Sequence, residues 1–135
     1  MTLIEIQVDG ASRGNPGLSG AGIVIKYNKT IFEYSFPLGV VSSHEAEFLA
    51  VIKALEICKE KYPNHILAFQ TDSQVVVNAI ENNYVRNPLF KPLLAKIDSL
   101  SSSFSYLFVK WIPSEQNRQA DKLAKEAIQS QLNKI

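Results

Sequence analysis

Residues 2–17 read TLIEIQVDGASRGNPG, and this stretch decides the fold. In its first half, Ile4, Ile6 and Val8 alternate with polar residues, and a repeat of two is typical of a β-strand with one buried face. Asp9 follows, and the glycine, asparagine and proline residues after it indicate a loop. The stretch therefore predicts a strand that delivers an aspartate to the start of a loop.

The same patterns extend through the rest of the chain. The predicted strands are residues 2–8, 20–27, 30–40, 66–71 and 104–111, and the predicted helices are residues 43–62, 73–81, 88–100 and 117–128. The first three strands form an antiparallel meander with a turn at Asn28-Lys29. Helices separate the first, fourth and fifth strands, so these three are expected to run parallel with right-handed crossovers. An α/β fold with a five-stranded mixed sheet and helices on both faces follows.

Composition bounds the class of protein. The 135 residues suit one domain, over residues 1–135, with residues 129–135 as a C-terminal tail. No apolar run approaches the roughly 20 residues of a membrane helix, so no membrane partner is expected. The first residues do not resemble a secretion signal, and a cytoplasmic protein is expected. A single cysteine, Cys58, excludes a disulfide framework within the chain and a cysteine-rich zinc site.

Four acidic residues stand where a metal site could form. Asp9 and Asp72 each follow a strand that is expected to be parallel to the other, and ligands gather at the carboxyl ends of such strands. Glu47 and Asp121 lie early in two helices and could face the same cleft. Carboxylates are the ligands that Mg²⁺ prefers, although each acidic residue alone is more simply explained as a turn or helix-end residue.

Four segments resemble the ribonuclease H type 1 family. The segments are VDGASRGNPG at residues 8–17, AEFLA at 46–50, TDSQ at 71–74 and NRQADKLA at 117–124. They resemble the family patterns D-G-S-x-x-x-N-P-G, A-E-x-x-A, T-D-S-x and N-x-x-A-D-x-L-A. The order and spacing also match over about residues 1–128. One such motif is weak, whereas four in order are specific.

The resemblance implies a ribonuclease H-like fold with strand order 3-2-1-4-5 and a monomer that acts on RNA/DNA hybrids. It implies hydrolysis of the RNA strand to 5′-phosphate and 3′-hydroxyl products with Mg²⁺ or Mn²⁺, two ions per site. The metal-binding catalytic set would be Asp9, Glu47, Asp72 and Asp121. The substrate-binding set would be Gly10, Ser12, Asn15, Ser42, Ser43, His44 and Gln74, with 2′-hydroxyl contacts that distinguish RNA from DNA.

The sequence departs from the family at three places. Ser42-Ser43-His44 replaces the T-N-N of many relatives, although serine and histidine still form hydrogen bonds. The loop after the last strand lacks the histidine of many bacterial relatives, and Glu115 is a candidate substitute. Residues 82–92 hold only Arg86 and Lys91 where some relatives have a basic protrusion. We therefore expect slower turnover and weaker, salt-sensitive binding.

Two alternatives remain open because one fold supports many activities. One is a catalytically weak or inactive module that binds nucleic acid or protein. The other is a nuclease for duplex RNA or for a single ribonucleotide embedded in DNA. The net charge of +1 neither favours nor excludes a nucleic-acid partner. Trp111, at the end of the last predicted strand, could stack on a base, but it is expected in the core because a strand-end tryptophan is more often a core residue.

Overall fold

The computed structural model describes residues 3–134, so Thr2 of the first predicted strand and Ile135 of the predicted tail lie outside it. The strands are β1 Leu3–Ser12, β2 Gly17–Tyr27, β3 Thr30–Val41, β4 Ile66–Thr71 and β5 Tyr106–Trp111. The α-helices are α1 Ser43–Lys61, α2 Gln74–Asn82, α3 Lys91–Ser101 and α4 Arg118–Leu132. Two short 3₁₀ helices, η1 Pro88–Phe90 and η2 Ser114–Gln116, precede α3 and α4.

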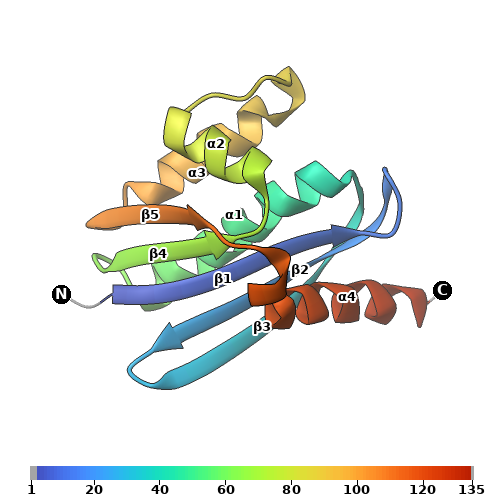
Figure 1. Ribbon diagram of the computed structural model, residues 1–135, viewed down its shortest axis with the longest axis horizontal. Helices are drawn as coiled ribbons and strands as arrows, with labels where there is room; N and C mark the ends of the chain where they lie inside the picture. The colour runs from blue at the N-terminus through green and yellow to red at the C-terminus, as the bar shows by residue number, and fades with distance from the viewer. Residues whose placement is uncertain (1–2, 135) are drawn as a thin grey trace.

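The sheet has the predicted order β3-β2-β1-β4-β5 (Figure 1). β2 pairs antiparallel with β1 and with β3, whereas β4 runs parallel to both β1 and β5. Asn28 and Lys29 form the turn between β2 and β3, with φ of 50° and 64°. Two successive left-handed residues suit the twist of a two-residue hairpin. The predicted α/β topology is confirmed.

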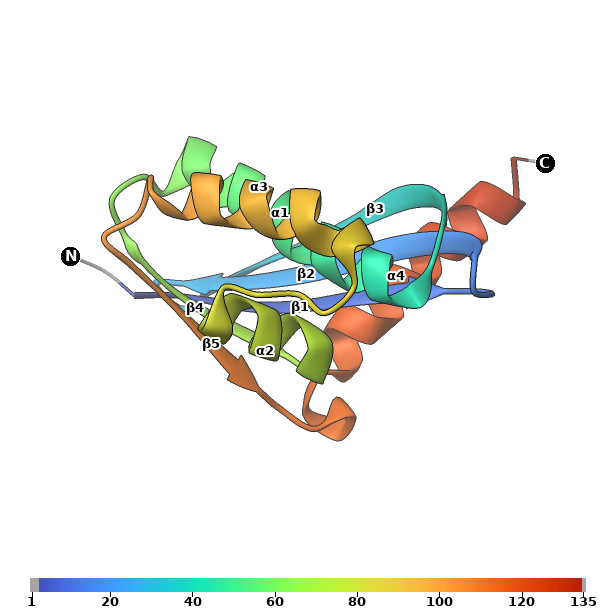
Figure 2. The same ribbon diagram turned by 90° about the horizontal axis from the view of Figure 1, so that it is seen from above.

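Helices cover both faces of the sheet (Figure 2). The larger core lies between the sheet and the layer of α1, α2 and α3, and the stripe predicted for α1 is buried there: Phe48, Val51, Ile52, Leu55 and Cys58. α4 lies on the opposite face, where Ala120 and Leu123 pack against Val24 of β2. Gly22 allows this close approach, because a Cβ at this position would overlap the Ala120 carbonyl.

Several predicted boundaries differ from the structure, and the two largest differences are at the ends of β1 and α4. β1 does not end at Val8, because residues 9–12 continue to pair with residues 19–22 of β2, and the loop shrinks to residues 13–16. The predicted tail is helical as far as Leu132. Gln131 holds this last turn, because its side-chain amide donates to Ser19 O at 2.7 Å and accepts from Gly39 N at 3.1 Å. Within residues 3–134, none of the helices is long and apolar enough to span a membrane.

Candidate metal centre

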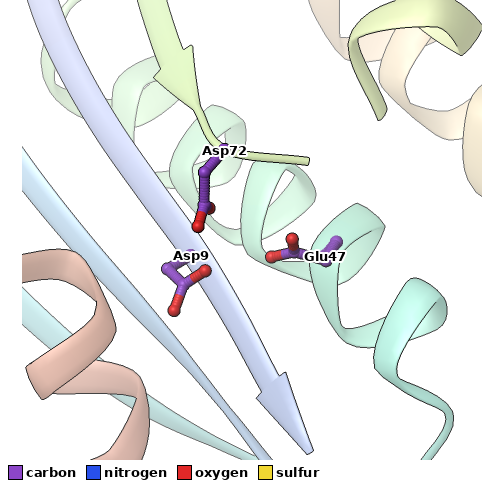
Figure 3. Close-up of side chains that lie close together, drawn as sticks. All are labelled: Asp9, Glu47 and Asp72. Atoms are coloured by element: carbon purple, nitrogen blue, oxygen red, sulfur yellow. The ribbon is translucent and has the colours of Figure 1, made fainter. Parts of the chain in front are cut away.

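Three acidic side chains meet beside β1, close to the C-terminal end of β4 (Figure 3). Asp9 comes from β1, Glu47 from α1, and Asp72 from the residue that follows β4. One oxygen atom from each residue lies within 4.8 Å of the other two. Residues far apart in sequence thus place three hard oxygen ligands around one point, which is the donor set that Mg²⁺ and Mn²⁺ prefer.

The parallel pairing of β1 and β4 brings the two aspartates together. Gln7 and Gln70 form the last pair of this ladder, and Asp9 and Asp72 each lie two residues beyond it. Two residues along a strand return to the same face, so Asp9 points to the same face of β1 as Gln7, opposite the buried Val8. Asp9 is therefore within β1 rather than at its end, although its position relative to Asp72 is as predicted.

A close contact between β1 and α1 positions Glu47. The N–H of Gly10 donates to Oε1 of Glu47 at 2.5 Å. A side chain at position 10 would overlap the main chain of Ala46, so glycine is required for this approach. Gly10 was predicted as a substrate-binding residue, and the structure gives it a further role, which is to let the helix approach the strand.

The negative charges of the clustered carboxylates are not neutralised by each other or by water. Burial, followed by the negative charges of Glu47 and Asp72, raises the pKa of Asp9 to about 10. Burial also raises the pKa of Glu47 to about 7, against the opposing hydrogen bond from Gly10. Asp9 is 6% exposed, so water gives its charge little relief. A divalent cation would remove this repulsion.

Asp121 stands outside the group of three. It approaches Asp9 from α4, and a side-chain hydrogen bond with Asp9 contributes to the raised pKa of that residue. Its Oδ2 accepts from Nζ of Lys125 at 2.9 Å, one turn further along the helix. The structure thus brings together three of the four predicted carboxylates and places the fourth beside Asp9.

Comparisons with known proteins identify the family of this chain. Residues 7–127 match the family described as reverse transcriptase-like. EbsB of Enterococcus faecalis, provisionally assigned to the hydrolases, is 42% identical over 94% of this chain and 95% of its own length. The ribonuclease H of Dichelobacter nodosus is 30% identical over 95% of this chain and 93% of its own length. This chain belongs to the ribonuclease H type 1 family.

Solved structures of the family agree with this assignment. LC11-RNase H1, solved in complex with an RNA/DNA hybrid, is 34% identical and superposes with a TM-score of 0.88 over 96% of this chain and 99% of that one. This ribonuclease H family member also matches the bifunctional protein Rv2228c of Mycobacterium tuberculosis at 29% identity, but it spans only 35% of that longer protein. The domain thus occurs both nearly alone and as part of a larger chain.

Several of the residues predicted to contact substrate hold the local structure of this ribonuclease H family member. Oδ1 of Asn15 accepts from the N–H of Ser43 at 3.1 Å, which ties the loop after β1 to the start of α1. Oγ of Ser12 donates to Val41 O at 3.1 Å. Oγ of Ser42 caps α1 by accepting from the N–H of Glu45 at 3.1 Å.

His44 and Gln74 are exposed on the two helices beside the centre. Gln74 begins α2, two residues after Asp72. His44 lies edge-on to Phe90, with 6.3 Å between the ring centroids, at a cavity of about 480 Å³. The cavity is lined by His44, Val75, Asn78, Ala79, Asn82, Tyr84, Val85, Arg86, Asn87 and Phe90. It offers apolar walls, amide groups and the guanidinium of Arg86.

Sequence reasoning missed two residues that touch Asp72. Nδ2 of Asn117 donates to Oδ1 of Asp72 at 3.3 Å, and Nε1 of Trp111 donates to the main-chain O of Asp72 at 3.2 Å. Asn117 was noticed as part of a motif but given no role. Trp111 was expected in the core, which is wrong, because the residue is 42% exposed. Glu115, the candidate substitute for the missing histidine, lies exposed in η2.

Proposed function

We propose that this protein is a metal-dependent endonuclease that hydrolyses the RNA strand of RNA/DNA hybrids to 5′-phosphate and 3′-hydroxyl products. The observation that carries the proposal is the meeting of Asp9, Glu47 and Asp72 in a member of the ribonuclease H family. A relative with the same fold, LC11-RNase H1, is known in complex with such a hybrid. We further propose that the protein acts as a monomer in the cytoplasm.

The carboxylate centre fits Mg²⁺ or Mn²⁺. Its ligand atoms are oxygens that crowd within 4.8 Å, and burial raises the pKa of both Asp9 and Glu47. Asp9, Glu47 and Asp72 would hold the metal, with Asp121 available beside Asp9. When bound, two such ions supply an activated water and stabilise the leaving oxygen of a phosphodiester.

The chain's own side chains orient the substrate. Gln74 and His44 are exposed on α2 and α1, and both can form hydrogen bonds with a ribose 2′-hydroxyl. Asn15 holds the loop after β1 against Ser43, which presents that loop and the start of α1 as one surface. These groups would place the RNA strand over the carboxylates and discriminate against DNA.

The cavity next to His44 would receive the second strand. Its walls combine apolar side chains with Asn78, Asn82 and Asn87, and Arg86 supplies a positive charge for a phosphate. The net charge of the chain is only +1, so the attraction to nucleic acid is local. Hybrid affinity should therefore be moderate and fall with added salt.

A substrate panel tests the proposal. End-labelled RNA/DNA hybrid, single-stranded RNA, duplex RNA, duplex DNA and DNA with one embedded ribonucleotide are incubated with Mg²⁺ or Mn²⁺. Internal cuts confined to the RNA strand of the hybrid, with 5′-phosphate ends, would support it. Cleavage of duplex RNA alone, or cleavage only at the embedded ribonucleotide, would mean that this other nucleic acid is the substrate instead of the hybrid. Hybrid binding without any cleavage would favour a binding module.

A further inference from the structure

The end of β5 and the segment that joins it to α4 form hydrogen bonds with Asp72 and with the adjacent strands. The N–H of Ile112 donates to Thr71 O at 2.9 Å, immediately before Asp72. Nε1 of Trp111 donates to the main-chain O of Asp72 at 3.2 Å. Nδ2 of Asn117 donates both to Oδ1 of Asp72 at 3.3 Å and to Val8 O of β1 at 2.8 Å. Main chain and side chain of Asp72 are thus held from the same segment.

The chemistry of its partners fixes the orientation of the Asn117 amide. Val8 O accepts only, and so does an ionised Asp72 carboxylate, so the side-chain nitrogen rather than the oxygen must face them. Asn117 is 1% exposed, and its Oδ1 has no hydrogen-bond partner within residues 3–134. A buried amide that leaves its own oxygen unpaired in order to bridge β1 and Asp72 is poorly explained by stability alone.

Trp111, like Asn117, contacts Asp72 in an arrangement that folding stability alone does not favour. A tryptophan contributes most to folding when its large ring is buried, yet this ring is 42% exposed at the end of β5. The contact that it does make is the bond from its indole nitrogen to the main-chain O of Asp72. The side chain therefore acts as a strut from the edge strand to the peptide group of Asp72.

We propose that Trp111 and Asn117 are positioning residues that hold Asp72 in place for metal binding. Trp111 restrains its main chain and Asn117 restrains its carboxylate. Together they would order Asp72 before the metal binds, so that metal binding loses less conformational entropy. The effect on metal affinity rests on the proposed function, whereas the effect on the order of Asp72 does not.

Matched variants separate positioning from folding. Trp111→Phe keeps an aromatic ring but removes the N–H donor, and Asn117→Leu keeps the approximate shape of the side chain but removes the amide donor without adding a charge. Tyr106→Phe on the same strand and Gln116→Ala beside Asn117 are the controls, because neither side chain forms a hydrogen bond to Asp72. Circular dichroism and thermal melting establish that each variant is folded.

Two measurements are made on the full chain. The ¹⁵N relaxation of the Asp72 amide, in metal-free protein, reports the order of its main chain. Titration calorimetry with Mn²⁺ alone reports metal affinity. We expect Trp111→Phe to increase the mobility of the Asp72 amide, and both variants to weaken Mn²⁺ binding by about 10- to 100-fold. The controls should match the wild type in both measurements.

Three outcomes decide the inference. Wild-type order at Asp72 in Trp111→Phe, together with wild-type Mn²⁺ affinity in both variants, would overturn it. A wild type that binds no Mn²⁺ and cuts no hybrid would remove the proposed function, and the relaxation measurement would then decide the positioning role by itself. If Asn117→Leu does not fold, Trp111→Phe decides the inference through both readouts.

Discussion

Gly10 and Glu47 are joined by a hydrogen bond of 2.5 Å from the main chain of β1 to the side chain of α1. Through this bond, the main chain of Gly10 holds the side chain of Glu47, which is one of the candidate metal ligands. It exists because α1 packs directly against the main chain of β1, where a Cβ would overlap Ala46. The integrity of the centre is therefore coupled to the packing of one helix on one strand.

The first prediction concerns this packing. Gly10→Ala should destabilise the protein by about 1–3 kcal/mol and abolish hybrid cleavage, because α1 must move away and carry Glu47 with it. Urea unfolding and a cleavage assay check both effects. Gly39→Ala is the control: its φ of +72° costs about 1 kcal/mol in a non-glycine residue, but a Cβ there would meet no neighbour. Retained cleavage in Gly10→Ala would contradict the packing argument.

The second prediction concerns pH. The pKa of Asp9 rises from 3.8 to about 10 on folding and that of Glu47 from 4.5 to about 7. Because both pKa values are raised, the folded protein keeps protons that the unfolded chain releases. The stability contributed by these groups is complete below about pH 4 and is lost as the pH rises toward 7 and beyond. Thermal melting of the metal-free protein should show this decline, and Mg²⁺ should reverse it.

Asp9→Asn supplies the matching test of the pH prediction. Asn neither takes up a proton on folding nor carries a charge, so near pH 8 the substitution should raise the unfolding free energy of the metal-free protein by about 1 kcal/mol or more while abolishing cleavage. Asp98→Asn, on the exposed surface of α3, should change neither property. If Asp9→Asn instead lowers stability at this pH, electrostatic repulsion at the centre is not the dominant effect.

The third prediction concerns the end of α4. Gln131 bonds to Ser19 and Gly39 and so fastens the last turn to β2 and β3. Gln131→Ala should cost about 1–2 kcal/mol and speed amide hydrogen exchange in the last turn of α4. Gln129→Ala is the control, because the side chain of Gln129 is exposed and bonds only to Asn133. Equal stability of the two variants would show that the contacts of Gln131 contribute nothing.

The fourth prediction concerns the cavity beside His44. If Arg86 contacts a phosphate, Arg86→Ala should weaken hybrid binding and reduce the slope of log affinity against log salt by about 1. Fluorescence anisotropy with a labelled hybrid, in Ca²⁺ to prevent turnover, measures both. Lys96→Ala removes an equal charge from α3, where Lys96 lies 3.8 Å from Glu56, and should leave the slope unchanged. An unchanged slope in Arg86→Ala would place the second strand elsewhere.

Much of the fold could be predicted because local patterns agree with it. The alternation of Ile4, Ile6 and Val8 identifies β1, and the intervening helices force β1, β4 and β5 to run parallel. That arrangement is also why Asp9 and Asp72 could be predicted to meet. The position of Glu47 followed from the family motif, and the structure adds the reason, which is the packing against Gly10.

The errors arose from contacts between distant segments. Residues 9–12 look like a loop by composition, but the main chain of β2 pairs with them. The last turn of α4 looks like a tail, but Gln131 bonds to strands more than 90 residues earlier. The roles of Trp111 and Asn117 depend on where β5 ends relative to Asp72, which residue types alone do not specify.

Cleavage of an end-labelled RNA/DNA hybrid by wild type, Asp72→Asn and Asp98→Asn, with Mg²⁺ and with Mn²⁺, tests the central claim most directly. The account predicts that wild type and Asp98→Asn cut the RNA strand, that the chelator EDTA stops both, and that folded Asp72→Asn is inactive. Cleavage that persists in Asp72→Asn, or an intact hybrid after incubation with folded wild type and either metal, would contradict it.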